Sequence, residues 1–119
     1  MLVRTAMFAA GIKVPTIDVF TLSSPTKASG CAPVVMSATW TISNPDNTTY
    51  KLVIAETGVE FNCASVIGTS VETANYYEDG ITQLVQPTLT LQVVVRADST
   101  VIDTKAAICG SSIYVGPAC

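Results

Sequence analysis

Apolar and polar side chains alternate residue by residue over two long stretches of this chain, 34–43 and 88–98. A period of two places alternate side chains on opposite faces of a β-strand, so each stretch predicts a strand with one buried face. The composition agrees, because 15 Val, 9 Ile and 16 Thr make up about a third of the 119 residues. Branched side chains of this kind fit a pleated sheet better than a helix. The sequence therefore predicts an all-β fold.

Turn residues divide the rest of the chain into strands of similar length. Pro, Gly and Asx residues fall between the apolar stretches, where they favour turns. The first expected strand carries apolar residues of both parities, which indicates an edge strand with a bulge midway. Seven antiparallel strands are expected, at 16–23, 34–43, 50–57, 59–63, 70–76, 88–98 and 101–109.

The inward positions of these strands define a predicted core. The clearest alternation is that of 34–43, where Trp40 shares the inward parity with Met36 and Ile42. Apolar side chains of the same parity on the other strands are expected to pack around Trp40. The alternation assigns the core to Met36, Trp40, Ile42, Tyr50, Leu52, Ile54, Leu91, Val93, Val95 and Ile102.

The first 14 residues form an apolar arm ahead of a single domain, which we expect at 15–119. The apolar stretch of the arm is short and ends at Lys13, and no small-residue cleavage site precedes Pro15, so we expect no signal peptide. The arm could be a simple tail, but its apolar side chains favour contact with a neighbouring subunit. The residues expected to make that contact are Leu2, Val3, Met7, Phe8 and Ile12.

The side chains that most catalytic sites need are missing or solvated. The chain has no histidine, which excludes Ser-His-Asp and Cys-His nucleophile systems and His-ligated metals. Glu56 lies beside the turn at 57–58 and Glu60 lies on an outward position, whereas a general acid needs a desolvated site. Glu78 and Asp79 supply too few oxygen ligands for calcium. We therefore expect no enzymatic activity, no cofactor and no metal.

Charge and hydropathy also limit the partners. Six Lys and Arg residues against nine Asp and Glu residues give a net charge of −3, so the basic patch that binds nucleic acid is missing. No apolar run approaches the roughly 18 residues of a membrane-spanning helix. The expected partners are other proteins, with neither nucleic acid nor membrane among them.

The order of these features resembles a fibronectin type III or related immunoglobulin-like β-sandwich. Trp40 stands near the end of the second strand, Tyr50 begins the third, and a long sixth strand forms a hairpin with the seventh. The resemblance implies two antiparallel sheets with Trp40 packed between them. It covers about residues 15–108, and departs from the family pattern where Leu89 and Leu91 replace the tyrosine of the sixth strand. A jelly roll or another β-sandwich is the alternative that this departure leaves open.

The four cysteines, Cys31, Cys63, Cys109 and Cys119, contain no CxxC pair, which argues against zinc or redox sites. Counting alone allows three sets of two disulfides. The sandwich topology implied by the resemblance brings Cys31 near Cys109 or Cys119, and a Cys31–Cys109 bridge is one expectation. Four reduced and mostly buried thiols are the other, and the lack of an export signal favours it.

Two functional classes remain. The first is a non-catalytic structural protein of a larger assembly, by analogy of fold a bacteriophage capsid decoration, head-fibre or tail protein made in the host cytoplasm. Its partners would be neighbouring virion proteins or copies of itself, contacted by the arm and the sheet edges. The second is an adhesin or carbohydrate-binding module at a cell surface or secreted, which would use its exposed loops, 44–49 and 74–86.

Overall fold

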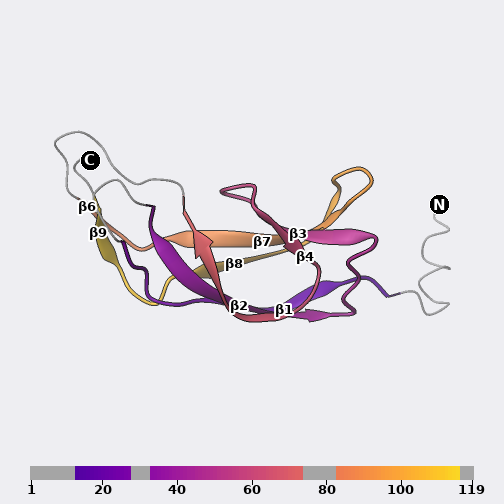
Figure 1. The fold of residues 1–119 in the computed structure, drawn as a ribbon, viewed down its shortest axis with the longest axis horizontal. Coiled ribbons are helices and arrows are strands. Elements are labelled where there is room, and N and C mark those ends of the chain that lie inside the picture. Colours follow the sequence, from indigo (N-terminus) through magenta and orange to yellow (C-terminus); the bar gives the residue numbers. More distant parts are fainter. Residues whose placement is uncertain (1–12, 28–32, 74–82, 116–119) are drawn as a thin grey trace.

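The computed structural model describes residues 13–27, 33–73 and 83–115, which form nine strands and no helix (Figure 1). All strand pairs in this part of the chain are antiparallel. The all-β prediction is confirmed, but seven strands are too few. The strands are β1 (Thr16–Leu22), β2 (Val35–Ser43), β3 (Tyr50–Ile54), β4 (Glu60–Asn62), β5 (Val66–Glu72), β6 (Gln83–Val85), β7 (Thr88–Val95), β8 (Val101–Ile108) and β9 (Ile113–Val115).

The strands form two larger sheets and a short ribbon. One sheet has the order β1-β2-β5 and the other the order β4-β3-β7-β8, while β6 and β9 pair with each other in a separate two-stranded ribbon. The two larger sheets lie as two layers in a β-sandwich-like arrangement, and the ribbon extends from one end (Figure 1). Buried side chains from both sheets form one core between the layers.

Trp40 is fully buried between the two sheets. Its ring meets Phe20 of its own sheet and Phe61 of the opposite sheet edge to face, with centroid distances of 6.2 Å and 5.1 Å. The indole N–H donates a hydrogen bond of 2.8 Å to the carbonyl oxygen of Ala64, in the link between β4 and β5. Edge-to-face aromatic contacts are favourable, and the bonded N–H removes the cost of burying a polar group.

The bulge expected in the first strand is confirmed. The register of β1 against β2 shifts between Ile17 and Val19, so Asp18 is an extra residue. Because of this extra residue, Ile17 is buried on the same side as Phe20, while Val19 is exposed.

Nine of the ten predicted core residues are buried or half-buried, and Ile102 is not. Ile102 is 37% exposed, because the β7–β8 register pairs the inward Leu91 and Val93 with Lys105 and Asp103. From Asp103 onward the inward positions of β8 are thus the odd-numbered ones, and Ile102, next to the register shift between Val93 and Val94, lies on the outer face. Tyr50 and Val95 are half-buried, and the fully buried members are Met36, Trp40, Ile42, Leu52, Ile54, Leu91 and Val93.

The fifth strand begins earlier than predicted. β5 spans Val66–Glu72 instead of 70–76, because a bulge at residues 67–68 lets its first residues pair with β2. Gly68 takes a φ of 69° there, a conformation that glycine adopts without strain. Ile67 is turned outward and is 92% exposed, which hides the strand pattern in the sequence.

Strands β6 and β9 continue the β7–β8 pair beyond an interruption and were not predicted. Two residues, 86 and 87, separate β6 from β7, whereas four, 109–112, separate β8 from β9. Pro87 has no N–H to donate, so the ladder breaks there. The Cys109 N–H donates to the Pro87 carbonyl oxygen at 2.8 Å, and the Gln86 side-chain amide donates to the Cys109 carbonyl oxygen at 2.8 Å.

One side of the sandwich is closed, because the edge strands β1 and β8 lie against each other. The backbone N–H of Ile17, at the β1 bulge, donates a hydrogen bond of 2.7 Å to Asp103 Oδ2 on β8. A charged acceptor makes this a stronger bond than one between neutral groups. The inward-facing side chain of Asp103 thus links β8 to β1, which belong to different sheets.

We expect Trp40→Ala to lower the free energy of unfolding by about 3 to 5 kcal/mol, because it leaves a large cavity between the sheets. Urea titration followed by circular dichroism measures this loss. Ile67→Ala, at an exposed position, is the control and should change it by less than about 0.5 kcal/mol. Equal effects of the two substitutions would contradict the burial described here.

We expect Asp103→Ala to lower the free energy of unfolding by about 1 to 2 kcal/mol, because the Ile17 N–H loses its charged acceptor. Thr104→Ala, one residue further along β8 on the exposed face, should be close to neutral. The same urea titration compares the two variants. A neutral Asp103→Ala would show that the contact between β1 and β8 does not depend on this hydrogen bond.

Candidate functional site

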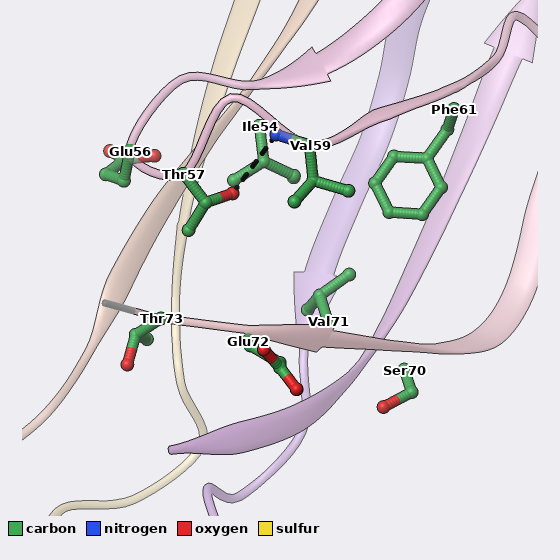
Figure 2. A pocket seen from close by; sticks show the side chains of 9 residues that line it. All are labelled: Ile54, Glu56, Thr57, Val59, Phe61, Ser70, Val71, Glu72 and Thr73. Atoms are coloured by element: carbon green, nitrogen blue, oxygen red, sulfur yellow. Dashed lines mark hydrogen bonds between the residues drawn. The ribbon is translucent and has the colours of Figure 1, made fainter. Parts of the chain in front are cut away.

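No described residue covers the side of the sandwich opposite β1 and β8, and a groove of about 580 Å³ lies there (Figure 2). One wall is the β3–β4 hairpin, at the edge of the four-stranded sheet, and the other is β5, at the edge of the three-stranded sheet. The groove is lined by Ile54, Glu56, Thr57, Val59, Phe61, Ser70, Val71, Glu72 and Thr73.

The floor of the groove is apolar. Ile54 and Val71 are buried, and Phe61 is half-buried against Trp40. Val59 and Phe61 point from the hairpin towards Val71 on the opposite wall (Figure 2). Along this edge the exposed fraction rises from 1% at Cys63 to 50% at Val59, so the core itself opens into the groove. A partner that buries this apolar surface gains about 25 cal/mol of binding free energy per Å².

The link between β4 and β5 is fixed to the core at two points. Trp40 Nε1 donates to the Ala64 carbonyl oxygen, and the Ile42 N–H donates to Ser65 Oγ, both at 2.8 Å. These two bonds hold the chain where it crosses from one sheet to the other. The two walls of the groove are therefore anchored to the same tryptophan-centred core.

The wall formed by β5 offers unpaired backbone groups. The Thr73 N–H donates to the Val34 carbonyl oxygen at 2.9 Å, in register with the β2–β5 pairing. Backbone groups of alternate residues point to the same side of a strand, so Val71 also faces β2, while Ser70 and Glu72 face away. Within the described residues, no strand pairs with that outer side of β5. An extended chain laid in the groove would find hydrogen-bonding partners there.

Two carboxylates, Glu56 and Glu72, lie at the rim of the groove, one on each wall. Glu56 accepts hydrogen bonds from the Thr90 N–H at 2.7 Å and the Thr90 hydroxyl at 2.8 Å, which fixes the hairpin to β7. Glu72 is exposed on the opposite wall. Together they give the rim a negative charge without burying either carboxylate.

Glu60 lies on β4, outside the groove lining, and forms an ion pair with Lys51 at 2.7 Å. The hydrogen bond from Lys51 and its positive charge lower the pKa of this carboxyl. A general acid needs a raised pKa, so Glu60 is poorly suited to that role. The other two carboxylates considered from the sequence, Glu78 and Asp79, lie outside the described residues.

The loop at 44–49 is held in place by Arg96. The guanidinium donates from Nη2 to Asn47 Oδ1 at 2.7 Å, and from Nε to the carbonyl oxygens of Asn47 and Tyr50. Asn47 Oδ1 also accepts the Cys63 N–H at 3.0 Å. The Asp46 carboxylate accepts hydrogen bonds from the backbone N–H groups of Thr49 and Thr48, and these bonds lower the pKa of the carboxyl. This exposed loop is therefore an ordered surface.

The residues assigned to the amino-terminal contact, Leu2, Val3, Met7, Phe8 and Ile12, all lie outside the described residues. The contact stays a prediction. The structure does place the start of β1, from which the arm leaves, at the end of the sheet where Thr16 pairs with Ser43.

Two of the four cysteines lie in the described part of the chain. Cys63 and Cys109 are buried free thiols, and burial raises the pKa of both. Cys31 and Cys119 lie outside it, so the proximity of Cys31 to Cys109 stays a prediction. The Gly110 N–H donates to the Ser23 carbonyl oxygen, and Thr26 pairs with Val35. The end of β8 and the start of β2 therefore both adjoin the segment 23–26.

The groove itself was not predicted from the sequence. The alternation of residues 59–63 puts Val59, Phe61 and Cys63 on one face, but it does not show that this face is covered only at Cys63 and is open at Val59. The one signal is an apolar Val59 directly after the turn glycine Gly58, where a hairpin end is usually polar.

In residues 13–27, 33–73 and 83–115, no three His, Cys, Asp or Glu residues come together as metal ligands. In the same ranges no helix is long and apolar enough to cross a membrane. No known protein-family model matches the chain, and comparisons with curated proteins and with solved structures found no match.

We expect Cys63 and Cys109 to resist thiol reagents in the folded protein, because they are buried and their raised pKa values keep them protonated. The test uses the Cys31→Ser/Cys119→Ser variant and 5,5′-dithiobis(2-nitrobenzoate) at pH 8. Both thiols should react quickly in guanidinium chloride and slowly without it. Equally fast reaction in both solutions would contradict their burial.

Proposed function

We propose that this protein is a non-catalytic component of a larger protein assembly, which it joins through its amino-terminal arm and its sheet edges. The open groove between β4 and β5 carries this proposal. It combines an apolar floor with unpaired backbone on β5, which is what a strand from another protein needs in order to add to a sheet.

The strand order supports an immunoglobulin-like sandwich of the fibronectin type III kind as the scaffold. If β1 to β5 are lettered A, B, C, C′ and E, and β7 and β8 are lettered F and G, the sheets are A-B-E and C′-C-F-G. Immunoglobulin-like domains also set A, B and E against C, F and G, with a tryptophan on a central strand. Here Trp40 stands on β2, the second strand.

We propose a virion as the assembly, with the protein acting as a bacteriophage capsid decoration, head-fibre or tail component made in the host cytoplasm. The support is analogy of fold: small sandwich domains with a terminal segment that anchors them to neighbours serve this role. Its partners would be other virion subunits or further copies of this chain, without nucleic acid, membrane or cofactor.

An adhesin or carbohydrate-binding module at a cell surface is the second candidate. The observation that favours it is the loop at 44–49, which Arg96 holds in one conformation at the surface. Pre-ordering a loop lowers the entropy lost on binding. Such a module would recognise its ligand without using the arm.

Removing residues 1–14 separates the two functions. The assembly role predicts that the full chain associates with itself or with a partner and that the shortened chain does not. Size-exclusion chromatography with light scattering measures the association. A cooperative thermal melt of the shortened chain is the control for folding.

A full chain that is monomeric, and that keeps the same partners after the deletion, would contradict the assembly role. Specific binding to a glycan array that survives the deletion would favour the second candidate.

A further inference from the structure

We propose that the groove between the β3–β4 hairpin and β5 receives residues 1–12 of a second copy of this chain, which add to the outer edge of β5 as an antiparallel or parallel strand. This inference rests on the proposed assembly function and identifies the surface and the segment that would carry it.

The groove fits an extended peptide better than a compact ligand. Its β5 wall presents the outward backbone groups of Ser70 and Glu72, and its floor presents Val59, Phe61 and Val71. An added strand places alternate side chains on one face, so every second residue can enter the apolar floor while the backbone pairs with β5.

The composition of residues 1–12 matches this groove. The segment contains no acidic residue and one arginine, Arg4, while the rim carries Glu56 and Glu72. Its larger apolar residues include both parities, Leu2 and Phe8 on one and Val3 and Met7 on the other. We take the face that carries Leu2 and the large Phe8 ring as the one that enters the floor, and opposite charges favour the approach of the segment.

The position of β1 favours a second copy over the chain's own arm. Thr16 pairs with Ser43, whereas the groove residues of β5 pair with residues 35–37, at the other end of β2. The separation is six to eight residues along β2, or about 20 to 27 Å, and β1 and β5 flank opposite sides of that strand.

A chain of 12 residues spans at most about 40 Å. The chain's own arm would use half or more of that length to reach the groove, and Met7 and Phe8, only five and four residues from residue 12, would fall short of it. An arm from a second copy is not tied to β1 of the same chain, so it can place its larger apolar residues, Met7 and Phe8 among them, in the groove.

The test measures self-association of full-length variants by sedimentation velocity over a range of concentrations. Val59→Glu places a charge on the apolar floor, and we expect it to weaken association by at least about tenfold. Val101→Glu is the matched control, because Val101 is exposed to a similar degree, 44% against 50%, but lies on β8. It should associate like the unmodified chain.

Ser70 allows a second, independent variant. Ser70→Pro removes one outward N–H from β5 and should weaken association by about fivefold or more, because one interchain hydrogen bond is lost. Ser70→Ala keeps that N–H and is its control. Thermal melts of each variant show whether the domain remains folded.

Mixing two defective chains gives the decisive measurement. Phe8→Glu should impair the arm but leave the groove intact, whereas Val59→Glu should do the reverse. Neither variant should associate alone, but the mixture should form a complex in which the arm of the Val59→Glu chain enters the groove of the Phe8→Glu chain.

The failure of this inference is distinguishable from failure of the assembly function. If Phe8→Glu abolishes association while Val59→Glu and Ser70→Pro do not, the arm docks elsewhere: the inference is overturned and the assembly role stands. Loss of association in Val101→Glu alone would also overturn it, in favour of a β8 interface. A full chain that stays monomeric at every concentration overturns the inference as well.

Discussion

The packing of Trp40 between the two sheets is the constraint on which the rest of the fold depends. Its ring contacts Phe20 in one sheet and Phe61 in the other, and its N–H holds the Ala64 carbonyl oxygen in the link between β4 and β5. The same side chain therefore sets the spacing of the layers and the path of the chain between them. Because both walls of the groove start from that link, the shape of the groove is tied to the core.

The strand edges are covered on one side of the sandwich, whereas on the other no described residue covers them. On one side Asp103 joins β8 to the bulge of β1, which covers both edges. On the other side β4 is only three residues long, and no strand in the described part of the chain pairs with the outer edge of β5. Natural proteins usually cover or shorten such edges to prevent association. An edge that combines open backbone with an apolar floor is therefore suited to a specific partner.

The sequence predicted strands where alternation is strong and failed where a bulge or an edge disturbs it. Around Trp40 and Leu91 the period of two identifies the buried face directly, because one parity is apolar and the other polar. On β8 both parities are mixed, since the inward Asp103 bonds to β1, and the apolar Ile102 was assigned to the wrong face. The β5 start and the groove depend on Gly68 and on sheet edges, which are tertiary features that local patterns do not contain.

A strand added to β5 would bind weakly at a single site. Each net hydrogen bond contributes about 1 kcal/mol, and the groove is short enough that few residues can pair with β5. Ordering a segment of chain costs about 1 to 2 kcal/mol per residue, which offsets much of the apolar burial. Such contacts become strong only when several are made at once, because linked sites bind with a high effective concentration. A weak edge contact therefore suits a repeating assembly, in which many copies of the chain are held side by side, better than an isolated pair.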